Sequence, residues 1–357
     1  MAARTARHPS RLVAEHAGPA LDVSLGRRAA TIHTPWRSPS SPRQPPVWGE
    51  DFEAKLGSPA DEAARCPIRP EAERLPAFPY TLLDVFTATP LEGNGLAVIH
   101  DADALGEETM LGIARETRLS ETTFVQTATA AGADYRNRIF TVAGELPFAG
   151  HPSLGTAVAV ARQRGLERAQ LTQQTGAGLQ PVDVELALAA TSGRASMLQE
   201  PAVFGPEVEA ASALAAAGLT AADADAGLSP RVVSTGMANV IAPVADPSAL
   251  ARASFDPSAL AALLEPLGAT VLYLAWWEPD RRRARARGFF HGGEDPATGS
   301  AAGPLLAMLA ERRGVSTLEI AQGVEMGRPS RIETAIEGDR VRVGGDVVVL
   351  VEGTLRL

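Results

Sequence analysis

The stretch GEDPATGSAAG, at residues 293–303, places acids, hydroxyls and glycines directly before an apolar run at 304–309. That run predicts a helix whose first turn begins inside the stretch. A helix N-terminus offers unpaired N–H groups and a partial positive charge, so it binds carboxylate or phosphate groups. The stretch could therefore hold an anion, with Asp295 and Ser300 beside it. Alternatively, Ser300 only caps its own helix.

A second stretch of similar design lies 148 residues earlier. AGHPSLGTAVAVARQR overlies ATGSAAGPLLAMLAERR so that Gly155 matches Gly303. In both places a glycine-containing turn leads into a helix of similar length. If the two stretches form an internal repeat, a pseudo-twofold axis could direct both helix N-termini at one cleft. Such a cleft could hold a small acid without any lysine, since glycine lets a ligand approach the backbone closely. The alternative is that Ser153, like Ser300, only caps its helix.

Lysine and cysteine are almost absent from the chain. The only lysine is Lys55 and the only cysteine is Cys66, so the chain has neither from about residue 79 onward. That part cannot use a thiolate nucleophile or a lysine Schiff base with a carbonyl or with pyridoxal phosphate. It also lacks the lysine of a phosphate-binding loop. The stretch at 293–303 fits neither the G-x-G-x-x-G dinucleotide fingerprint nor the alternating acids of a calcium-binding loop.

The charge balance narrows the class of partner. The chain has 33 Lys and Arg against 42 Asp and Glu, a net charge of −9, which argues against a general nucleic-acid binder. We interpret the arginine-rich run at 281–288 as a solvated loop. No apolar stretch is long enough to span a bilayer, and the first residues lack the apolar core of a secretory signal. We therefore expect a cytoplasmic protein with no nucleic-acid or membrane partner.

The segments that must position these residues begin near residue 79. Residues 1–78 are rich in proline and serine with weak apolar periodicity, so we expect a disordered extension. A translation start assigned too far upstream would account for it. From Tyr80 the pattern becomes ordered, and 106–118 has helical spacing with Met110, Ile113 and Ala114 on one face. Strands are predicted at 80–87, 96–100, 121–129 and 134–142.

The rest of the chain is again predicted to contain both strands and helices. Helices are predicted at 156–165, 204–219 and 256–268, and strands at 182–188, 194–200, 231–244 and 269–279. Several alternating strands joined by Gly-Asp and Gly-Gly turns close the chain after residue 316. Many strands with a few embedded helices predict an α+β body.

Five segments together resemble a known family. In order they are DVFTATPLEGNGLAVI, RLSETTFVQ, RIFTVAGELPFAGHPSLGTA, GEDPATGSAAG and QGVEMGRPSRI. Their order and spacing resemble the PhzF-like family, which is named for an isomerase of phenazine biosynthesis and is related in fold to diaminopimelate epimerase. The resemblance covers about residues 80–357. It implies two pseudo-symmetric lobes, each a β-barrel-like sheet around a central helix. We expect residues 79–192 plus 346–357 in the first lobe and 193–345 in the second.

The resemblance also implies a homodimer, no cofactor, and an active site between the lobes. It places the family's general acid/base on Glu121, in the SET motif. The substrate-binding groups that it implies are His151, Asp295, Ser300, Gly150 and Gly299. There are three departures from the family pattern: Gly95 and Val142 stand where the family usually has proline, and the loop around 287–300 is a few residues shorter. Because the resemblance places that loop at the border of the pocket, the substrate stays unassigned.

The chemistry that these residues would perform is proton transfer. A carboxylate partly buried in a closed cleft has its pKa raised, so Glu121 could take a proton from one carbon and return it to another. Without the resemblance, the plainer interpretation of Glu121 is a solvated residue at the start of a strand. His151 could then be a capping or packing residue, and Asp295 could cap the helix turn.

We therefore expect a cofactor-independent isomerase acting on a small carboxylate-bearing molecule. The alternatives are an amino-acid racemase or epimerase, and a non-catalytic small-acid binding protein of the same fold. No spacing of His, Asp and Glu resembles a metal site, and none is predicted.

Overall fold

The fold is known from a computed structural model that describes residues 76–186 and 191–357. These residues lie within one compact unit. Of the segment expected to be disordered, residues 1–75 lie outside the described residues. Strand β1 (Ala77–Val85) begins at its end, and its alternating and then continuous burial marks an element that enters a core.

Eight strands of the first lobe close into a barrel. The circuit runs from β1 through β2 (Asn94–Ile99), β3 (Glu121–Gln126), β4 (Tyr135–Phe140), β6 (Arg168–Thr175), β7 (Gly178–Leu186), β8 (Ser192–Leu198) and β17 (Arg340–Arg356) back to β1. The pairs β2–β3 and β4–β6 are parallel, and the others are antiparallel. The short strand β5 (Glu145–Leu146) adds to β4. Closure leaves the circuit without an open edge.

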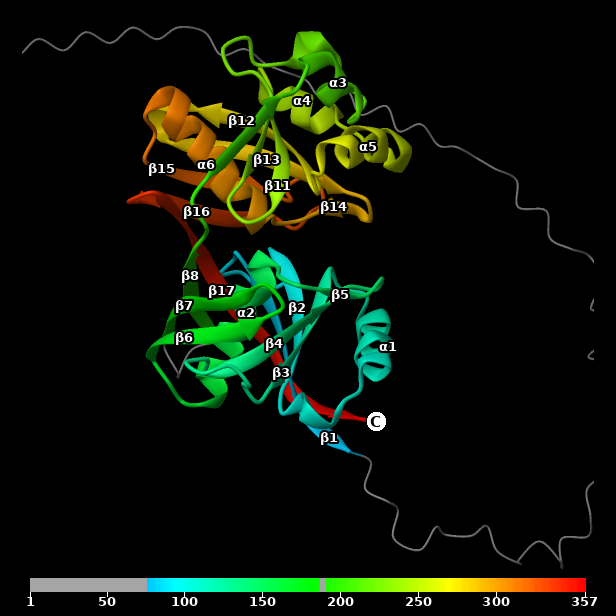
Figure 1. Ribbon diagram of the computed structural model, residues 1–357, viewed down its shortest axis with the longest axis vertical. Helices are drawn as coiled ribbons and strands as arrows, with labels where there is room; N and C mark the ends of the chain where they lie inside the picture. The colour runs from blue at the N-terminus through cyan, green and yellow to red at the C-terminus, as the bar shows by residue number, and fades with distance from the viewer. Residues whose placement is uncertain (1–75, 187–190) are drawn as a thin grey trace, which may run out of the picture. The chain divides into compact units, whose positions relative to one another are not determined.

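Helix α2 (Gly150–Gln163) fills this barrel (Figure 1). It contacts all eight strands of the circuit and is buried on every side from His151 to Ala161. A helix surrounded in this way needs small and apolar residues all round, and alanine, valine and glycine supply them. Its first turn therefore emerges at one end of the barrel, where the catalytic candidates are found.

The second lobe repeats the pairing order of the first. Its strands are β10 (Arg231–Ser234), β11 (Ala238–Pro243), β12 (Val271–Glu278), β13 (Arg283–Phe290), β14 (Gly293–Asp295), β15 (Thr317–Gln322) and β16 (Ser330–Glu337). They pair antiparallel, parallel, antiparallel, antiparallel, parallel and antiparallel, as β1 to β7 do. Helix α6 (Gly299–Arg313) takes the place of α2. The internal repeat predicted from the sequence is confirmed.

The last strand joins the lobes. Residues near its start pair with β16, residues 342–348 pair with β8, and its second half pairs with β1. Figure 1 shows β17 running from one lobe to the other. Because β17 pairs with strands of both lobes, the predicted lobe boundary at 345/346 falls within this strand. We keep the predicted lobe boundaries as a proposal.

Additional helices cover the outer faces of the strands. Helix α1 (Glu107–Thr117) buries Met110, Ile113 and Ala114, as its periodicity predicted, against Phe124 and Phe140. Helices α3 (Ala210–Ala215), α4 (Pro247–Arg252) and α5 (Pro257–Leu264) share a second apolar cluster with the strands of the second lobe. Short 3-10 helices lie at η2 (Ala102–Ala104), η3 (Ala221–Asp223), η4 (Glu265–Leu267) and η5 (Pro279–Arg281).

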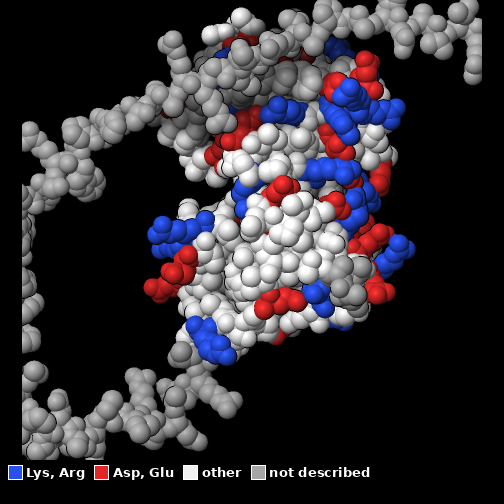
Figure 2. Space-filling view, turned by 180° about the vertical axis from the view of Figure 1, so that it is seen from behind, with Lys and Arg blue, Asp and Glu red and all other residues white. Residues whose placement is uncertain are grey.

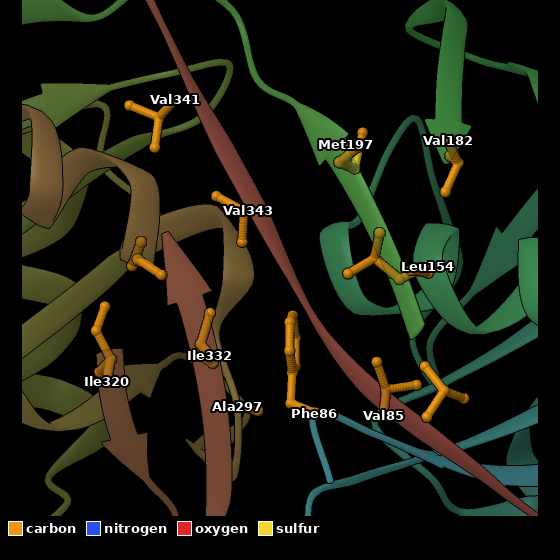
Figure 3. Close-up of a cluster of buried hydrophobic side chains, with 14 of the residues drawn as sticks. Val85, Phe86, Leu154, Val182, Met197, Ala297, Ile320, Ile332, Val341 and Val343 are labelled. Atoms are coloured by element: carbon orange, nitrogen blue, oxygen red, sulfur yellow. The ribbon is translucent and has the colours of Figure 1, made fainter. Parts of the chain in front are cut away.

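The main apolar core extends through both lobes. Figure 3 shows Phe86 between side chains of the first lobe, such as Leu154, and side chains of the second lobe, such as Ile332. Phe86 is fully buried, although its φ of 66° is unusual for a bulky residue. A strained backbone persists where the surrounding packing holds it, and here Phe86 lies where the lobes meet.

Two of the predicted elements are wrong. The run at 281–288 is mostly strand β13 rather than a solvated loop, because its alternate alanines, Ala284 and Ala286, are buried. The helix predicted at 204–219 is confined to α3, because residues 203–207 form strand β9 (Val203–Glu207) beside β10.

Charged side chains on the face shown in Figure 2 are interspersed, with no broad basic field. In the described ranges, no helix has the length and apolar character needed to cross a membrane.

Candidate active site

The first turns of the two central helices face each other. A Cβ atom built on Gly150, at the start of α2, would lie 3.5 Å from the backbone nitrogen of Ser300 and 3.7 Å from Cα of Gly299. Both helices therefore begin at one point, although their starts are far apart in the sequence. The convergence predicted from the sequence repeat is confirmed.

Neither helix start is closed by a side-chain cap. The N-cap residues are Ala149 for α2 and Thr298 for α6, and neither side chain accepts a hydrogen bond from the backbone of its helix. Ser153 donates to the carbonyl of Ala149 at 2.7 Å, so it is not an N-cap. The first N–H groups of a helix have no partner within the helix. The capping interpretation of the two serines is therefore wrong, and the paired helix starts form a region suited to an anion.

Glu121 lies at the beginning of β3, beside this region. Its Oε2 atom is 3.3 Å from Nε2 of His151, and its side chain is 16% exposed. Burial and, secondarily, the negative charge of Asp295 raise the pKa of Glu121 from 4.5 to about 8. Near neutral pH the residue is therefore poised between its acid and base forms, as a group that both gives and takes a proton must be.

His151 occupies the first turn of α2, with its side chain 5% exposed. Burial lowers its pKa to about 3, so the imidazole is neutral at physiological pH. Its Nδ1 atom lies 3.2 Å from the amide nitrogen of Asn94, at the start of β2. Its Nε2 atom and Oε2 of Glu121 are buried and form no aligned hydrogen bond within the described part of the chain. Both atoms thus keep hydrogen-bonding capacity for a substrate.

Asp295 ends β14 and comes from the other lobe. Its Oδ1 accepts a hydrogen bond from Asn94 at 2.7 Å, and its Oδ2 accepts one from Thr298 at 2.8 Å. Burial raises the pKa of Asp295 to about 6, and the hydrogen bonds from Thr298 and Asn94 limit the rise. Asp295 is therefore largely ionised near neutral pH, while Glu121 is largely protonated.

A buried glutamine holds the turn that carries Asp295. Gln322 donates to the carbonyl of Asp295 at 2.7 Å and to the hydroxyl of Thr298 at 2.8 Å. The side-chain carbonyl oxygen of Gln322 accepts from the backbone N–H of Thr298 at 3.0 Å and from the hydroxyl of Tyr273 at 2.9 Å. These contacts explain why Thr298 does not cap α6: its side chain is already used in the turn.

Two further amides hold the start of α6. Gln199 donates to the carbonyl of Gly299 at 2.9 Å, and Asn239 donates to the carbonyl of Ser300 at 2.9 Å. A Cβ on Gly299 would approach the ring of Phe86 to 3.2 Å. The first turn of α6 is thus fixed from both sides, which keeps its N–H groups directed at the first turn of α2.

The loop before Asn94 is tied to the second lobe. Arg328 donates to the carbonyl of Gly93 at 2.8 Å and to the buried carboxylate of Asp84 at 2.6 Å. Asp84 also accepts from the backbone N–H of Leu91 at 2.7 Å. Arg328, from the second lobe, therefore fixes the loop of the first lobe that places Asn94 in the site.

The structure brings together every residue predicted for the site: Glu121, His151, Asp295, Ser300, Gly150 and Gly299. Sequence reasoning missed Asn94, Gln199 and Gln322. Asn94 lies within EGNG, which the sequence pattern presents only as a chain break. Gln199 and Gln322 lie at strand ends, and no local signal distinguishes a buried glutamine there from a solvated one.

The described residues offer no group of three or more His, Cys, Asp or Glu side chains that could hold a metal ion. A recess of about 570 Å³ lies elsewhere, on β7, β8 and β15–β17. Its arginines Arg194, Arg331 and Arg342 already bind carboxylates.

Comparison with known proteins agrees with this geometry. The family model for phenazine biosynthesis-like proteins, PhzC-PhzF, matches residues 83–353. A trans-2,3-dihydro-3-hydroxyanthranilate isomerase of Pseudomonas aeruginosa is 37% identical over 77% of this chain and 98% of its own. The structure of a predicted epimerase from Pseudomonas aeruginosa is 36% identical, with a TM-score of 0.69 over 78% of this chain and 99% of its own.

A more distant structure shows the fold alone. A hydroxyproline epimerase of Agrobacterium vitis is 13% identical, with a TM-score of 0.55 over 79% of this chain and 93% of its own. Its likeness agrees with the expected two-lobed α+β architecture of the diaminopimelate epimerase type. The family model matches most of the chain, and the match to the isomerase covers nearly the full length of that relative. The chain therefore belongs to the phenazine biosynthesis-like (PhzC-PhzF) family and is an enzyme of its isomerase class.

Proposed function

We propose that this enzyme moves a proton on a small carboxylate-bearing substrate, with Glu121 as the general acid/base and no cofactor. One observation carries the proposal. A carboxyl group whose pKa is raised to about 8 lies 3.3 Å from a neutral histidine, at the point where two helix N-termini meet. The helix starts supply the anion site, and the carboxyl group supplies the proton carrier.

Each group has a separate task in the proposed reaction. Backbone N–H groups at Gly150, Gly299 and Ser300 bind the substrate carboxylate. Glu121 in its ionised form takes a proton from one carbon, the double bond shifts, and the protonated Glu121 returns a proton to another carbon. His151 and Asp295 orient the substrate. The proton count balances within the substrate, so no external acid or base is consumed.

The chemistry of the substrate follows from these groups. The relative from Pseudomonas aeruginosa is named for a dihydro-hydroxyanthranilate, a compound with carboxylate, amino and hydroxyl groups. An ionised Asp295 is suited to an amino or hydroxyl donor, and the helix starts are suited to the carboxylate. We therefore propose an unsaturated amino- or hydroxy-carboxylate as the substrate class.

Exchange in heavy water tests the proposal. Wild-type enzyme should incorporate deuterium into trans-2,3-dihydro-3-hydroxyanthranilate, and Glu121→Gln should not, because an amide cannot accept the proton. Glu311→Gln is the matched control, since Glu311 is a surface carboxylate paired with Arg231. Equal uptake by wild type and Glu121→Gln would remove Glu121 from the mechanism. Saturable binding without exchange would favour a non-catalytic binding protein, and inversion of a free amino acid would favour a racemase.

The remaining parts of the proposal concern the assembly and its needs. We propose a cytoplasmic homodimer, which sedimentation at micromolar concentration would detect as twice the monomer mass. Cofactor independence predicts full activity after dialysis against a chelator, with no pyridoxal phosphate or flavin added. Loss of activity that is restored by a metal ion or by either cofactor would contradict it.

A further inference from the structure

Asn94 connects three groups of the site through one amide nitrogen. This buried nitrogen lies 2.7 Å from Oδ1 of Asp295, 3.2 Å from the carbonyl oxygen of Ala297 and 3.2 Å from Nδ1 of His151. Two of these contacts are with the second lobe, and the third is with the first turn of α2. Asn94 is therefore placed to influence the imidazole as well as to join the lobes.

The orientation of this amide is determined by its surroundings. The carbonyl of Ala297 can only accept a hydrogen bond, so the group facing it must be the NH₂ of Asn94 and not its oxygen. The carboxylate of Asp295 requires the same orientation. An amide NH₂ only donates, and its two hydrogens serve three facing acceptors, so at least one hydrogen is shared between two of them. The Nδ1 atom of His151, which faces it, must therefore carry a lone pair and no proton.

The position of the remaining histidine proton follows. His151 is buried and neutral, so it carries one ring proton. With Nδ1 unprotonated, that proton is on Nε2, which lies 3.3 Å from Oε2 of Glu121 and forms no aligned hydrogen bond within the described residues. The Nε2–H group is thus a free donor beside the proton carrier.

We propose that Asn94 is a positioning residue that fixes His151 as the Nε2–H tautomer, so that His151 serves the reaction as a neutral hydrogen-bond donor and not as a base. The catalytic part of this inference rests on the proposed function, whereas the tautomer does not. A neutral donor beside the reacting carbons stabilises negative charge that develops on a substrate oxygen when the proton leaves. It also leaves Glu121 as the proton carrier.

Replacement of Asn94 by aspartate gives the sharpest contrast. The carboxyl group introduced by Asn94→Asp has nearly the same shape as the amide. It shares one proton with Asp295, whose Oδ1 lies 2.7 Å away, and its remaining lone pairs accept at Nδ1 where the amide donates. A carboxylate facing Nδ1 favours the Nδ1–H tautomer, which turns the Nε2 lone pair toward Glu121. Asn94→Ala removes the preference and should give a mixture of tautomers. The matched control is Asn137→Asp, because Asn137 is a buried amide that binds Gln173 inside the barrel, away from His151.

Nitrogen-15 NMR of histidine-labelled protein reads the tautomer directly. The chain has 6 histidines, and loss of one pair of signals in His151→Gln assigns His151. At pH 7 the wild type and Asn137→Asp should show a protonated Nε2 and an unprotonated Nδ1, and Asn94→Asp the reverse. A protonated Nδ1 in the wild type, or no change in Asn94→Asp, would overturn the proposal. If Asn94→Asp proves unfolded by its amide spectrum, the Asn94→Ala spectrum decides, and an unaltered single tautomer there overturns it.

Kinetics test the catalytic part separately. Loss of one donor to developing charge lowers kcat by about 100-fold, so Asn94→Asp should lose this much in kcat with a smaller change in KM. A lowered affinity with unchanged kcat would limit Asn94 to a structural role and overturn the catalytic part. If wild type shows the Nε2–H tautomer but no deuterium exchange, the proposed function fails while the tautomer assignment holds.

Discussion

Replacing Gly150 by alanine should weaken carboxylate binding without weakening the fold. The new Cβ would lie 3.5 Å from the backbone nitrogen of Ser300, an ordinary contact that needs no rearrangement. A carboxylate oxygen bound to that nitrogen would have to lie about 2.9 Å from it, in much the same space. The methyl group therefore competes with the ligand and not with the protein.

The size of the effect follows from the lost contact. A hydrogen bond to a charged group contributes about 1.5–3 kcal/mol, and each 1.4 kcal/mol is about a tenfold change in affinity. Loss of one such bond should raise KM by about 10- to 150-fold. Stability should stay equal or rise, by at most about 1 kcal/mol, because alanine is favoured over glycine in a helix.

The matched control is the same substitution five residues further along α2. A Cβ on Gly155 would lie 2.6 Å from Leu96 Cδ2 and 2.8 Å from side-chain atoms of Leu83 and Val85. Overpacking of this kind costs about 1–3 kcal/mol. Gly155→Ala should therefore unfold at lower urea concentration, while its folded fraction binds substrate normally.

Urea unfolding and substrate titration, measured on both variants, test this reasoning. Gly150→Ala with unaltered KM would show that the carboxylate does not bind between the helix starts. Equal destabilisation of both variants would show that the space at Gly150 belongs to the core, as the space at Gly155 does.

The remaining predictions concern pH and packing. Because the folded pKa of Glu121 is about 8 against 4.5, the folded state retains a proton that the unfolded state loses, so stability should fall as pH rises from about 4.5 to 8. Glu121→Gln should remove this loss and be more stable than wild type at pH 9, by at most on the order of 5 kcal/mol, with no difference near pH 4. A difference in urea unfolding that stays constant with pH would contradict the raised pKa. Gly303→Ala should destabilise the protein by several kcal/mol, because its Cβ would lie 1.8 Å from Oε1 of Gln199, and near-native thermal unfolding would show that Gln199 can move away. Arg287→Leu should lower the free energy of unfolding by about 3–5 kcal/mol, because it leaves Glu294 with its charge unpaired and largely buried. The double variant with Glu294→Leu should recover part of this stability in urea unfolding.

Local pattern predicted much of the secondary structure and failed where burial decides. The apolar spacing of α1 depends on one helix face and was confirmed. The arginine-rich run in β13 was interpreted as a loop because its charges dominate the composition, yet its two alanines bury one face of a strand. Strand β6, with the sequence RAQLTQQT, was not predicted because its polar residues mask the burial of Leu171 and Gln173.

Residue type and spacing by themselves determined the class of chemistry. The absence of lysine and cysteine from the body, the two glycine-containing helix starts and the acid at Glu121 are all properties of the sequence. They excluded thiolate and Schiff-base chemistry and indicated a backbone anion site, because those consequences depend only on which functional groups are present.

Only the tertiary structure decided how these groups act together. The meeting of Gly150 with Ser300, the position of Asn94 between two lobes and the raised pKa of Glu121 depend on contacts between distant parts of the chain. Burial and the field of neighbouring charges set a pKa, and neither can be read from adjacent residues. The sequence therefore specified an acid, two helix starts and a histidine, and folding made them one site.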